Sequence, residues 1–178
     1  MTVFHSGIYV KRIRNGQAGF EYQGDCLGVF LSKTTGEIRR VVCQLSTGVS
    51  VCLPASSIAK ISEGKIFVKN MKTSLPTNGF YLTPDLPVYS STADYLGLLT
   101  NVTVRFNTVY QLIIENKKYP AVALNTVQDA VFLKPTVYPV GEWAKAEKAN
   151  VTGKLLKAKI RQGSLINFTL SLSPFSNG

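Results

Sequence analysis

Side chains able to carry out acid–base chemistry are scarce in this sequence. It contains a single histidine, His5, close to the first residue, and its ten acidic residues are scattered. General acid–base catalysis needs titratable groups held together with separated pKa values. The sequence also lacks the phosphate loop G-x-x-x-x-G-K-[ST], the nucleophile elbow G-x-S-x-G and the zinc helix H-E-x-x-H. We therefore predict no catalytic, cofactor-binding or metal-binding residues, and no enzymatic activity.

Cysteine is rare and shows no pairing pattern. Cys26, Cys43 and Cys52 make an odd count without C-x-x-C spacing, and only His5 could join them as a ligand. We predict that they are thiols of the protein core. Side chains alternate between the two faces of a strand, so Cys52 should point away from Cys43, which argues against a disulfide between them.

Long apolar runs are absent. No segment approaches the roughly 20 apolar residues that a membrane helix needs. Residues 1–16 lack the central apolar run of a secretory signal and contain Lys11, Arg12 and Arg14 instead. We expect no membrane insertion and a cytoplasmic location, with a virion as the alternative.

The charge balance is strongly positive, with a formal net charge of +10. Such a surplus favours nucleic acid, an anionic membrane face or an acidic protein as a partner, without choosing among them. The basic residues concentrate modestly in two segments. The candidate basic contact surface is Lys11, Arg12 and Arg14, followed by Lys145, Lys148, Lys154, Lys157, Lys159 and Arg161.

Short runs rich in Val, Ile, Tyr, Phe and Thr, separated by turn residues, predict an all-β protein. Residues 8–14 and 17–22 flank Asn15-Gly16, a dipeptide typical of a tight two-residue hairpin. A second hairpin is predicted around Thr47-Gly48. Aromatic residues interleave with basic ones in the first half, as in stacking platforms of single-strand binders, but filling of the core is the more common use of such rings.

Residues 85–134 repeat the organisation of the first half. A shift of the chain by 69 positions places Gly97 on Gly28, Asp94 on Asp25 and Leu112 on Cys43, while residues 131–134 match 66–69 after a short deletion. The ordered apolar pattern predicts an internal duplication. We expect a first unit over residues 1–70, a linker over 71–84, a second unit over 85–134 and a basic C-terminal arm over 135–178, with Gly28 and Gly97 at equivalent positions.

The first unit resembles the PRC-barrel family of small β-barrels. The matching elements are Leu27-Gly28-Val29, Thr35-Gly36-Glu37-Ile38, Val41-Val42, Gly48, Pro54, Ile58, Ile61 and Ile66-Phe67-Val68. The match is good over residues 20–69 and looser over 88–134. The resemblance implies two tandem small β-barrels that bind a partner and do not catalyse a reaction.

Residues 167–173 alternate apolar and polar side chains, which predicts a final strand with one buried face. Phe168, Leu170 and Leu172 form that face. We expect this strand to pair with a sheet edge outside the second unit, on the first unit or on a neighbouring subunit, so a homo-oligomer is possible.

These features favour a non-catalytic binding or assembly module that docks on a protein or ribonucleoprotein partner. Nucleic acid is a possible ligand because of the positive charge. The competing hypothesis is a structural subunit of a larger particle, such as the capsid, connector or tail of a phage virion.

Overall fold

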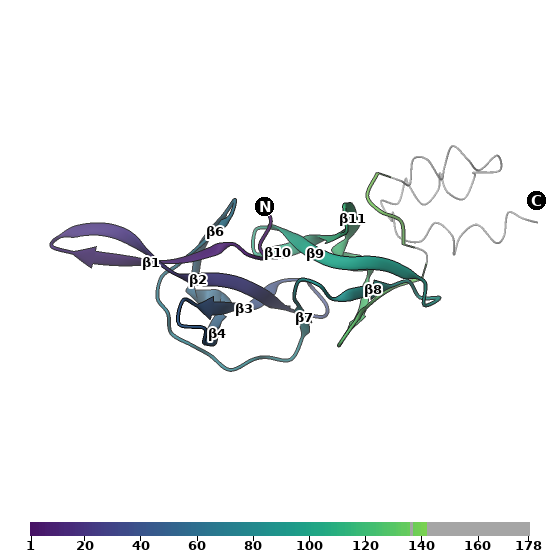
Figure 1. Ribbon diagram of the computed structural model, residues 1–178, viewed down its shortest axis with the longest axis horizontal. Helices are drawn as coiled ribbons and strands as arrows, with labels where there is room; N and C mark the ends of the chain where they lie inside the picture. The colour runs from purple at the N-terminus through teal and green to yellow at the C-terminus, as the bar shows by residue number, and fades with distance from the viewer. Residues whose placement is uncertain (136, 142–178) are drawn as a thin grey trace, which may run out of the picture.

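Thirteen β-strands in two sheets form the part of the chain that the structure describes, residues 1–135 and 137–141 of a computed structural model. The N-terminal sheet contains β1 (Gly7–Arg14), β2 (Gln17–Leu31), β3 (Ile38–Leu45), β4 (Ser50–Pro54), β5 (Ile58–Ser62), β6 (Lys65–Val68) and β7 (Phe80–Leu82). The C-terminal sheet contains β8 (Pro87–Tyr89), β9 (Tyr95–Arg105), β10 (Thr108–Ile114), β11 (Lys117–Pro120), β12 (Leu124–Val127) and β13 (Val131–Leu133). The two sheets lie at opposite ends of the long axis (Figure 1). The described residues form strands and two 3-10 turns, which confirms the predicted all-β class for this part of the chain.

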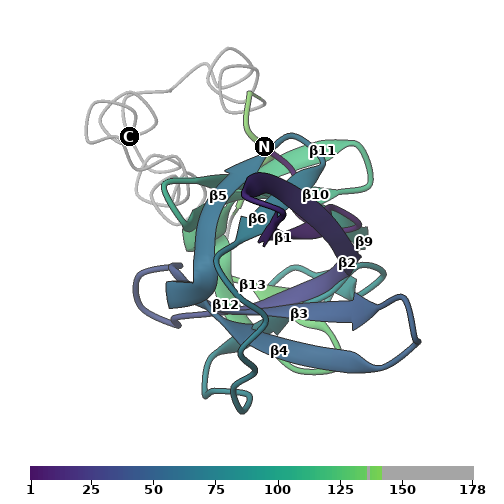
Figure 2. The ribbon, with the colours of Figure 1, turned by 90° about the vertical axis from the view of Figure 1, so that its left-hand side faces the viewer.

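The two sheets have the same strand order. It is β4-β3-β2-β1-β6-β5 in the N-terminal sheet and β11-β10-β9-β8-β13-β12 in the C-terminal sheet. In both, the first and last strands in space follow each other in the chain across a 3-10 turn, η1 (Ala55–Ser57) and η2 (Ala121–Ala123). Figure 2, viewed from the end with the β1–β2 hairpin, shows the N-terminal sheet curving around its interior. Every strand of the C-terminal sheet therefore has a counterpart in the first.

Both predicted hairpins are present. Arg14 pairs with Gln17 across Asn15 and Gly16, which have φ angles of 52° and 77°. These positive values at both turn positions are those that an Asn-Gly turn tolerates best. Gln44 pairs with Ser50 across the turn that contains Thr47-Gly48. Local turn chemistry was thus sufficient to place both.

The predicted register of the repeat is wrong. Gly97 pairs with Val88, as Gly24 pairs with Ile8, so the counterpart of Gly97 is Gly24 and not Gly28. By the same pairing Asp25 corresponds to Leu98 rather than Asp94. A constant shift fails because the connections differ in length: the chain runs from Leu31 to Ile38 in the first sheet, but from Val104 to Val109 in the second.

One part of the predicted alignment agrees with the strand pairing. Ile66 lies beside Ile8 in a parallel pair, and Val131 lies beside Val88 in the same way. The match of residues 131–134 to 66–69 is therefore confirmed for the strands.

Each sheet also pairs with the segment that precedes the first strand of the other sheet in the chain. The predicted linker contains β7, which precedes β8 and pairs with β2 through Phe30 and Tyr81. The segment in front of β1 forms a bridge from Thr2 to Thr103 on β9. Phe30 and Thr103 occupy equivalent register positions, because Phe30 faces Arg40 and Thr103 faces Gln111. The two leading segments are thus exchanged reciprocally.

A symmetric pair of hydrogen bonds joins the sheets near their common centre. The Ile38 amide donates to the Asn107 carbonyl at 2.9 Å, and the Val109 amide donates to the Gly36 carbonyl at 3.0 Å. Ile38 and Val109 are counterparts, so exchanging the two units maps one bond onto the other. Such self-complementary contacts are those of a twofold interface. The described chain is therefore built about a pseudo-twofold relation.

Aliphatic side chains from both sheets form one continuous core. Val3 and Phe4 of the leading segment are buried in it, together with inward-facing residues such as Ile8, Val10 and Leu99. None of the described helical turns is long and apolar enough to span a bilayer. The predicted basic residues Lys145, Lys148, Lys154, Lys157, Lys159 and Arg161, and the predicted strand with Phe168, Leu170 and Leu172, lie outside the described residues.

Candidate binding surface

Four aromatic rings gather on the outer face of β1, β2 and β6. The Tyr9 ring centroid lies 5.7 Å from that of Tyr22 and 5.8 Å from that of Phe67, and the Phe20 centroid lies 4.8 Å from that of Phe67. Cross-strand pairing explains the group, because Tyr9 is opposite Tyr22 and also beside Phe67. We call Tyr9, Phe20, Tyr22 and Phe67 the aromatic face.

These rings do not fill the core, contrary to the more common use expected from the sequence. Phe20 is 57% exposed and Tyr22 48% exposed. Their strands supply the core with the alternate side chains, such as Ile8, Val10 and Ile66, so the rings must point outwards. Of the aromatic residues in the first half, Phe80 is buried, while Phe30 and Tyr81 stack across β2 and β7 with centroids 4.4 Å apart.

Lysines surround the aromatic face. The Lys65 ammonium lies 5.6 Å from the centre of the Tyr9 ring, a cation–π contact. A groove of about 410 Å³ runs beside Phe20 and Phe67, with Lys11, Lys60 and Lys69 in its lining. All four lysines are exposed, and none has an ion-pair partner among residues 1–135 and 137–141. We call Lys11, Lys60, Lys65 and Lys69 the lysine set.

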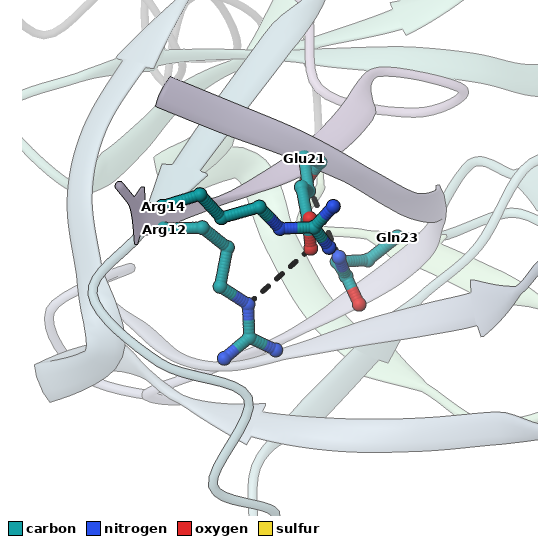
Figure 3. A network of polar contacts seen from close by, with 4 residues as sticks. All are labelled: Arg12, Arg14, Glu21 and Gln23. Carbon is teal, nitrogen blue, oxygen red and sulfur yellow. Dashed lines mark hydrogen bonds and ion pairs between the residues drawn. The ribbon is translucent and has the colours of Figure 1, made fainter. Parts of the chain in front are cut away.

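The predicted basic cluster of the first hairpin is split between two faces. Arg12 and Arg14 both form ion pairs with Glu21, the former at 3.4 Å between Nε and Oε2 (Figure 3). The Gln23 side-chain amide donates to the Glu21 carbonyl beside them. Alternation along β1 sends Lys11 to the opposite face, where it joins the groove. Of the three predicted contact residues, only Lys11 lies with the aromatic face.

Residues 11–20 of this hairpin are exposed along their whole length. The hairpin extends beyond the rest of the N-terminal sheet (Figure 1). The groove with Phe20 lies on one of its faces, and the Arg12–Glu21–Arg14 cluster lies on the other. Both faces are therefore open to a partner.

The C-terminal sheet carries an equivalent set of rings with fewer lysines around it. The Tyr89 centroid lies 5.6 Å from those of both Tyr95 and Phe132. Strand pairing makes these residues the counterparts of Tyr9, Tyr22 and Phe67. Thr126 takes the position of Lys60, because it pairs with Phe132 as Lys60 pairs with Phe67. Ala130 takes the position of Lys65, because it directly precedes Val131 as Lys65 precedes Ile66. Lys134 follows β13 as Lys69 follows β6, so one lysine of the set is retained. The positive charge is therefore denser on the first copy.

Sequence reasoning did not single out Lys60, Lys65, Lys69 or the second set of rings. A signal was present in residues 65–69, where Lys65, Phe67 and Lys69 alternate with buried Ile66 and Val68. That pattern indicates a strand whose outer face is basic and aromatic. The signal is easily missed because Phe67 is itself apolar, so Ile66, Phe67 and Val68 also form a continuous apolar run without alternation.

Few other groups at this surface could take part in chemistry. A hydrogen bond with Asp25, followed by partial desolvation, raises the pKa of the Tyr22 hydroxyl above its usual value. Within the described ranges, no three His, Cys, Asp or Glu side chains are grouped in a way that could hold a metal ion. The surface offers ring faces and ammonium groups, which suit binding.

The cysteines lie apart from this surface as free thiols. Cys43 is opposite Val51 and Cys52 is opposite Val42, so Cys43 and Cys52 point to opposite faces, as predicted. Burial raises the pKa of Cys26 from 9.0 to about 12 and that of Cys43 to about 11. Both thiols are therefore protonated at neutral pH, and neither is a ready nucleophile.

Alkaline pH should destabilise the protein through Cys26. The unfolded thiol ionises near pH 9.0 and the folded one only near pH 12, so stability is intact below pH 9 and is lost as pH rises towards 12. Between pH 9 and 11 this thiol should remove about 2 kcal/mol of unfolding free energy. Urea titrations of the wild type and Cys26→Ala should give a steeper pH dependence for the wild type. Cys52→Ala is the control, and equal slopes for wild type and Cys26→Ala would contradict the assignment.

Comparison with known proteins gives no family assignment: no family model and no curated protein matches this chain.

Proposed function

We propose that this protein is a non-catalytic binding and assembly module that docks on a protein or ribonucleoprotein partner through the aromatic face and the lysine set. One observation carries the proposal: two exposed rings, two partly exposed rings and four lysines without ion-pair partners among the described residues share one side of a sheet. Aromatic residues are enriched where proteins bind partners, and a free positive surface attracts acidic ones. A cytoplasmic location is part of the proposal.

The fold is proposed to consist of two tandem PRC-barrel-like units that arose by duplication. Support comes from the shared strand order, from the equivalent pairing of β1 with β6 and of β8 with β13, and from the equivalent ring sets around Tyr9 and Tyr89. The reciprocal contacts between the units suit a rigid scaffold, because each leading segment is held by the other unit. A rigid scaffold loses little conformational entropy when it binds.

A structural subunit of a larger particle, such as a phage virion, is the second candidate. The projecting β1–β2 hairpin favours it, because Ile13 near its tip is 70% exposed and no described residue covers either face. Hairpins of this kind gain burial when a neighbouring subunit packs against them. The alternative location is then the virion.

Mass photometry of the full chain should separate the two. A docking module is expected to give a single species at the monomer mass of 19.5 kDa, or a small oligomer that does not grow with concentration. Because 19.5 kDa is small for this method, sedimentation velocity should be run in parallel. Closed rings or larger assemblies in either measurement would contradict the module and support the particle subunit.

A further inference from the structure

We propose that the groove beside Phe20 and Phe67 binds a single strand of nucleic acid, with bases on the rings and phosphates on the lysine set. This inference deepens the proposed function and rests on it, since it names the chemistry of the partner. The groove lies between the β1–β2 hairpin and the β5–β6 hairpin and has an open volume of about 410 Å³.

The two groove rings are suited to stacking because Phe20 is exposed, Phe67 is partly exposed, and each is held against the other. Phe20 and Phe67 meet edge to face with an interplanar angle of 68°, so each supports the other while part of each ring remains open. A base stacked on an aromatic side chain contributes about 1–3 kcal/mol, and every base has a face to stack. The site therefore favours a strand with unpaired bases and little sequence preference.

The lysines lie where a sugar–phosphate backbone would pass. Lys11, Lys60 and Lys69 line the groove, and Lys65 lies over the Tyr9 ring at its side. Lys69 donates a hydrogen bond to the Ser56 carbonyl at 3.4 Å, which keeps its ammonium beside the groove. No carboxylate lines the groove. Uncompensated ammonium groups beside ring faces are the combination found where proteins follow single strands.

A duplex fits this arrangement less well. The bases of a duplex are stacked inside it and cannot reach Phe20 or Phe67 without being flipped out, which costs a few kcal/mol. A projecting hairpin can also enter the major groove, where Arg, Lys, Asn and Gln side chains read the base edges. That mode would use the tip around Asn15 and Gly16 and leave the groove rings without a role. The rings lie farther back, towards the body of the sheet.

The C-terminal sheet provides an internal control. Tyr95 is the counterpart of Tyr22 and is 57% exposed, but the lysines at the positions of Lys60 and Lys65 are missing. Tyr95→Ala removes an exposed ring of similar size from a position that does not line the groove. It therefore separates a specific site from a general effect of surface rings.

Fluorescence anisotropy with labelled U12 and dT12 tests the inference on the full chain at 50 mM and 150 mM salt. Phe20→Ala should weaken binding about tenfold, the loss of one stacked base, whereas Tyr95→Ala should change it less than twofold. Replacing Lys60 and Lys69 by alanine should reduce the salt slope, log Kd against log salt, by about 1.4. Thermal melts should confirm that each variant folds. Comparing U12 with dT12 shows whether RNA or DNA is preferred.

Several results would overturn the inference. Equal affinities of Phe20→Ala, Tyr95→Ala and the wild type would place binding elsewhere on the chain. A duplex bound as tightly as U12, with the same loss in Phe20→Ala, would point to recognition by the hairpin. Displacement of U12 by polyglutamate at equal charge, or no binding at 50 mM salt, would point to an acidic protein partner. In the last two cases a monomer in sedimentation would still support the docking module.

Discussion

Replacing Gly24 by alanine is expected to destabilise the protein by about 4 kcal/mol or more, a large part of the roughly 5–15 kcal/mol that stabilises an ordinary domain. A Cβ at this position would lie 1.9 Å from the Gln44 carbonyl oxygen and 2.8 Å from the Leu45 Cα. Both atoms belong to the backbone of β3, which cannot move without breaking its pairing with β2. The positive φ of 156° adds strain for any residue with a side chain. Urea denaturation followed by circular dichroism measures the loss.

Two other glycines make matched controls. Gly19 lies on the same strand with no atom within 4 Å of a Cβ, so Gly19→Ala should change stability by less than about 0.5 kcal/mol. Gly97 is the counterpart of Gly24, but a Cβ there would meet Cγ of Glu115 at 2.4 Å, a side chain that can turn away. Gly97→Ala should therefore lower the unfolding free energy by about 2 kcal/mol, because alanine is strained at a φ of 123° and the Leu98 amide loses its hydrogen bond to the Glu115 carboxylate. Equal stabilities of Gly24→Ala and Gly19→Ala would contradict this packing.

The all-β fold and its hairpins were predictable because they depend on neighbouring residues. Asn15-Gly16 and Thr47-Gly48 specify their turns locally, and the runs around them alternate with period two. The repeat was also detectable, since the order of apolar segments survives changes in loop length. These features need no knowledge of distant contacts.

The register of the repeat could not be read from the same pattern. Leu112 corresponds to Val41, whereas the sequence alignment had placed it on Cys43, two residues away. A shift of two residues returns every side chain to the same face, so the apolar pattern fits both registers equally well. Only the hydrogen-bonded pairing separates them.

The candidate surface was only partly predictable. Lys11 was named from its charge, but Arg12 and Arg14 next to it are turned away and paired with Glu21. The rest of the lysine set comes from β5, from β6 and from the residue directly after β6, more than forty residues along the chain from Lys11. The parallel pairing of β1 with β6 brings Tyr9 beside Phe67, and a parallel pair leaves no local signal in the sequence.

The reciprocal exchange of leading segments has a consequence for how the chain folds. Because the segment before β1 pairs with β9 and β7 pairs with β2, each sheet is completed by residues that belong to the other half of the chain. The same is true of the central bonds of Ile38 and Val109. Contacts over such sequence separations form late and link the two sheets in one cooperative unit. Separate expression of either half would leave the pairing sites on β2 or β9 open.

Asn101 is the side chain on which this exchange depends most, so Asn101→Ala should cost about 3 kcal/mol of unfolding free energy. Its carboxamide oxygen accepts from the amides of Val3 at 3.0 Å, Phe4 at 2.9 Å and Val102 at 2.9 Å, and its nitrogen donates to the Phe4 carbonyl at 3.3 Å. Alanine leaves part-buried amides without an acceptor, at about 1–3 kcal/mol for such groups.

Hydrogen exchange should then accelerate at Val3 and Phe4, as the leading segment leaves β9. Asn101→Asp is the control, because it keeps an acceptor oxygen for the amides of Val3 and Phe4. It also adds a charge and turns an oxygen towards the Phe4 carbonyl in place of the donated bond, so its stability should fall while the two amides stay better protected than in Asn101→Ala. Unchanged exchange at Val3 and Phe4 in Asn101→Ala would show that burial of their side chains holds the segment without this amide.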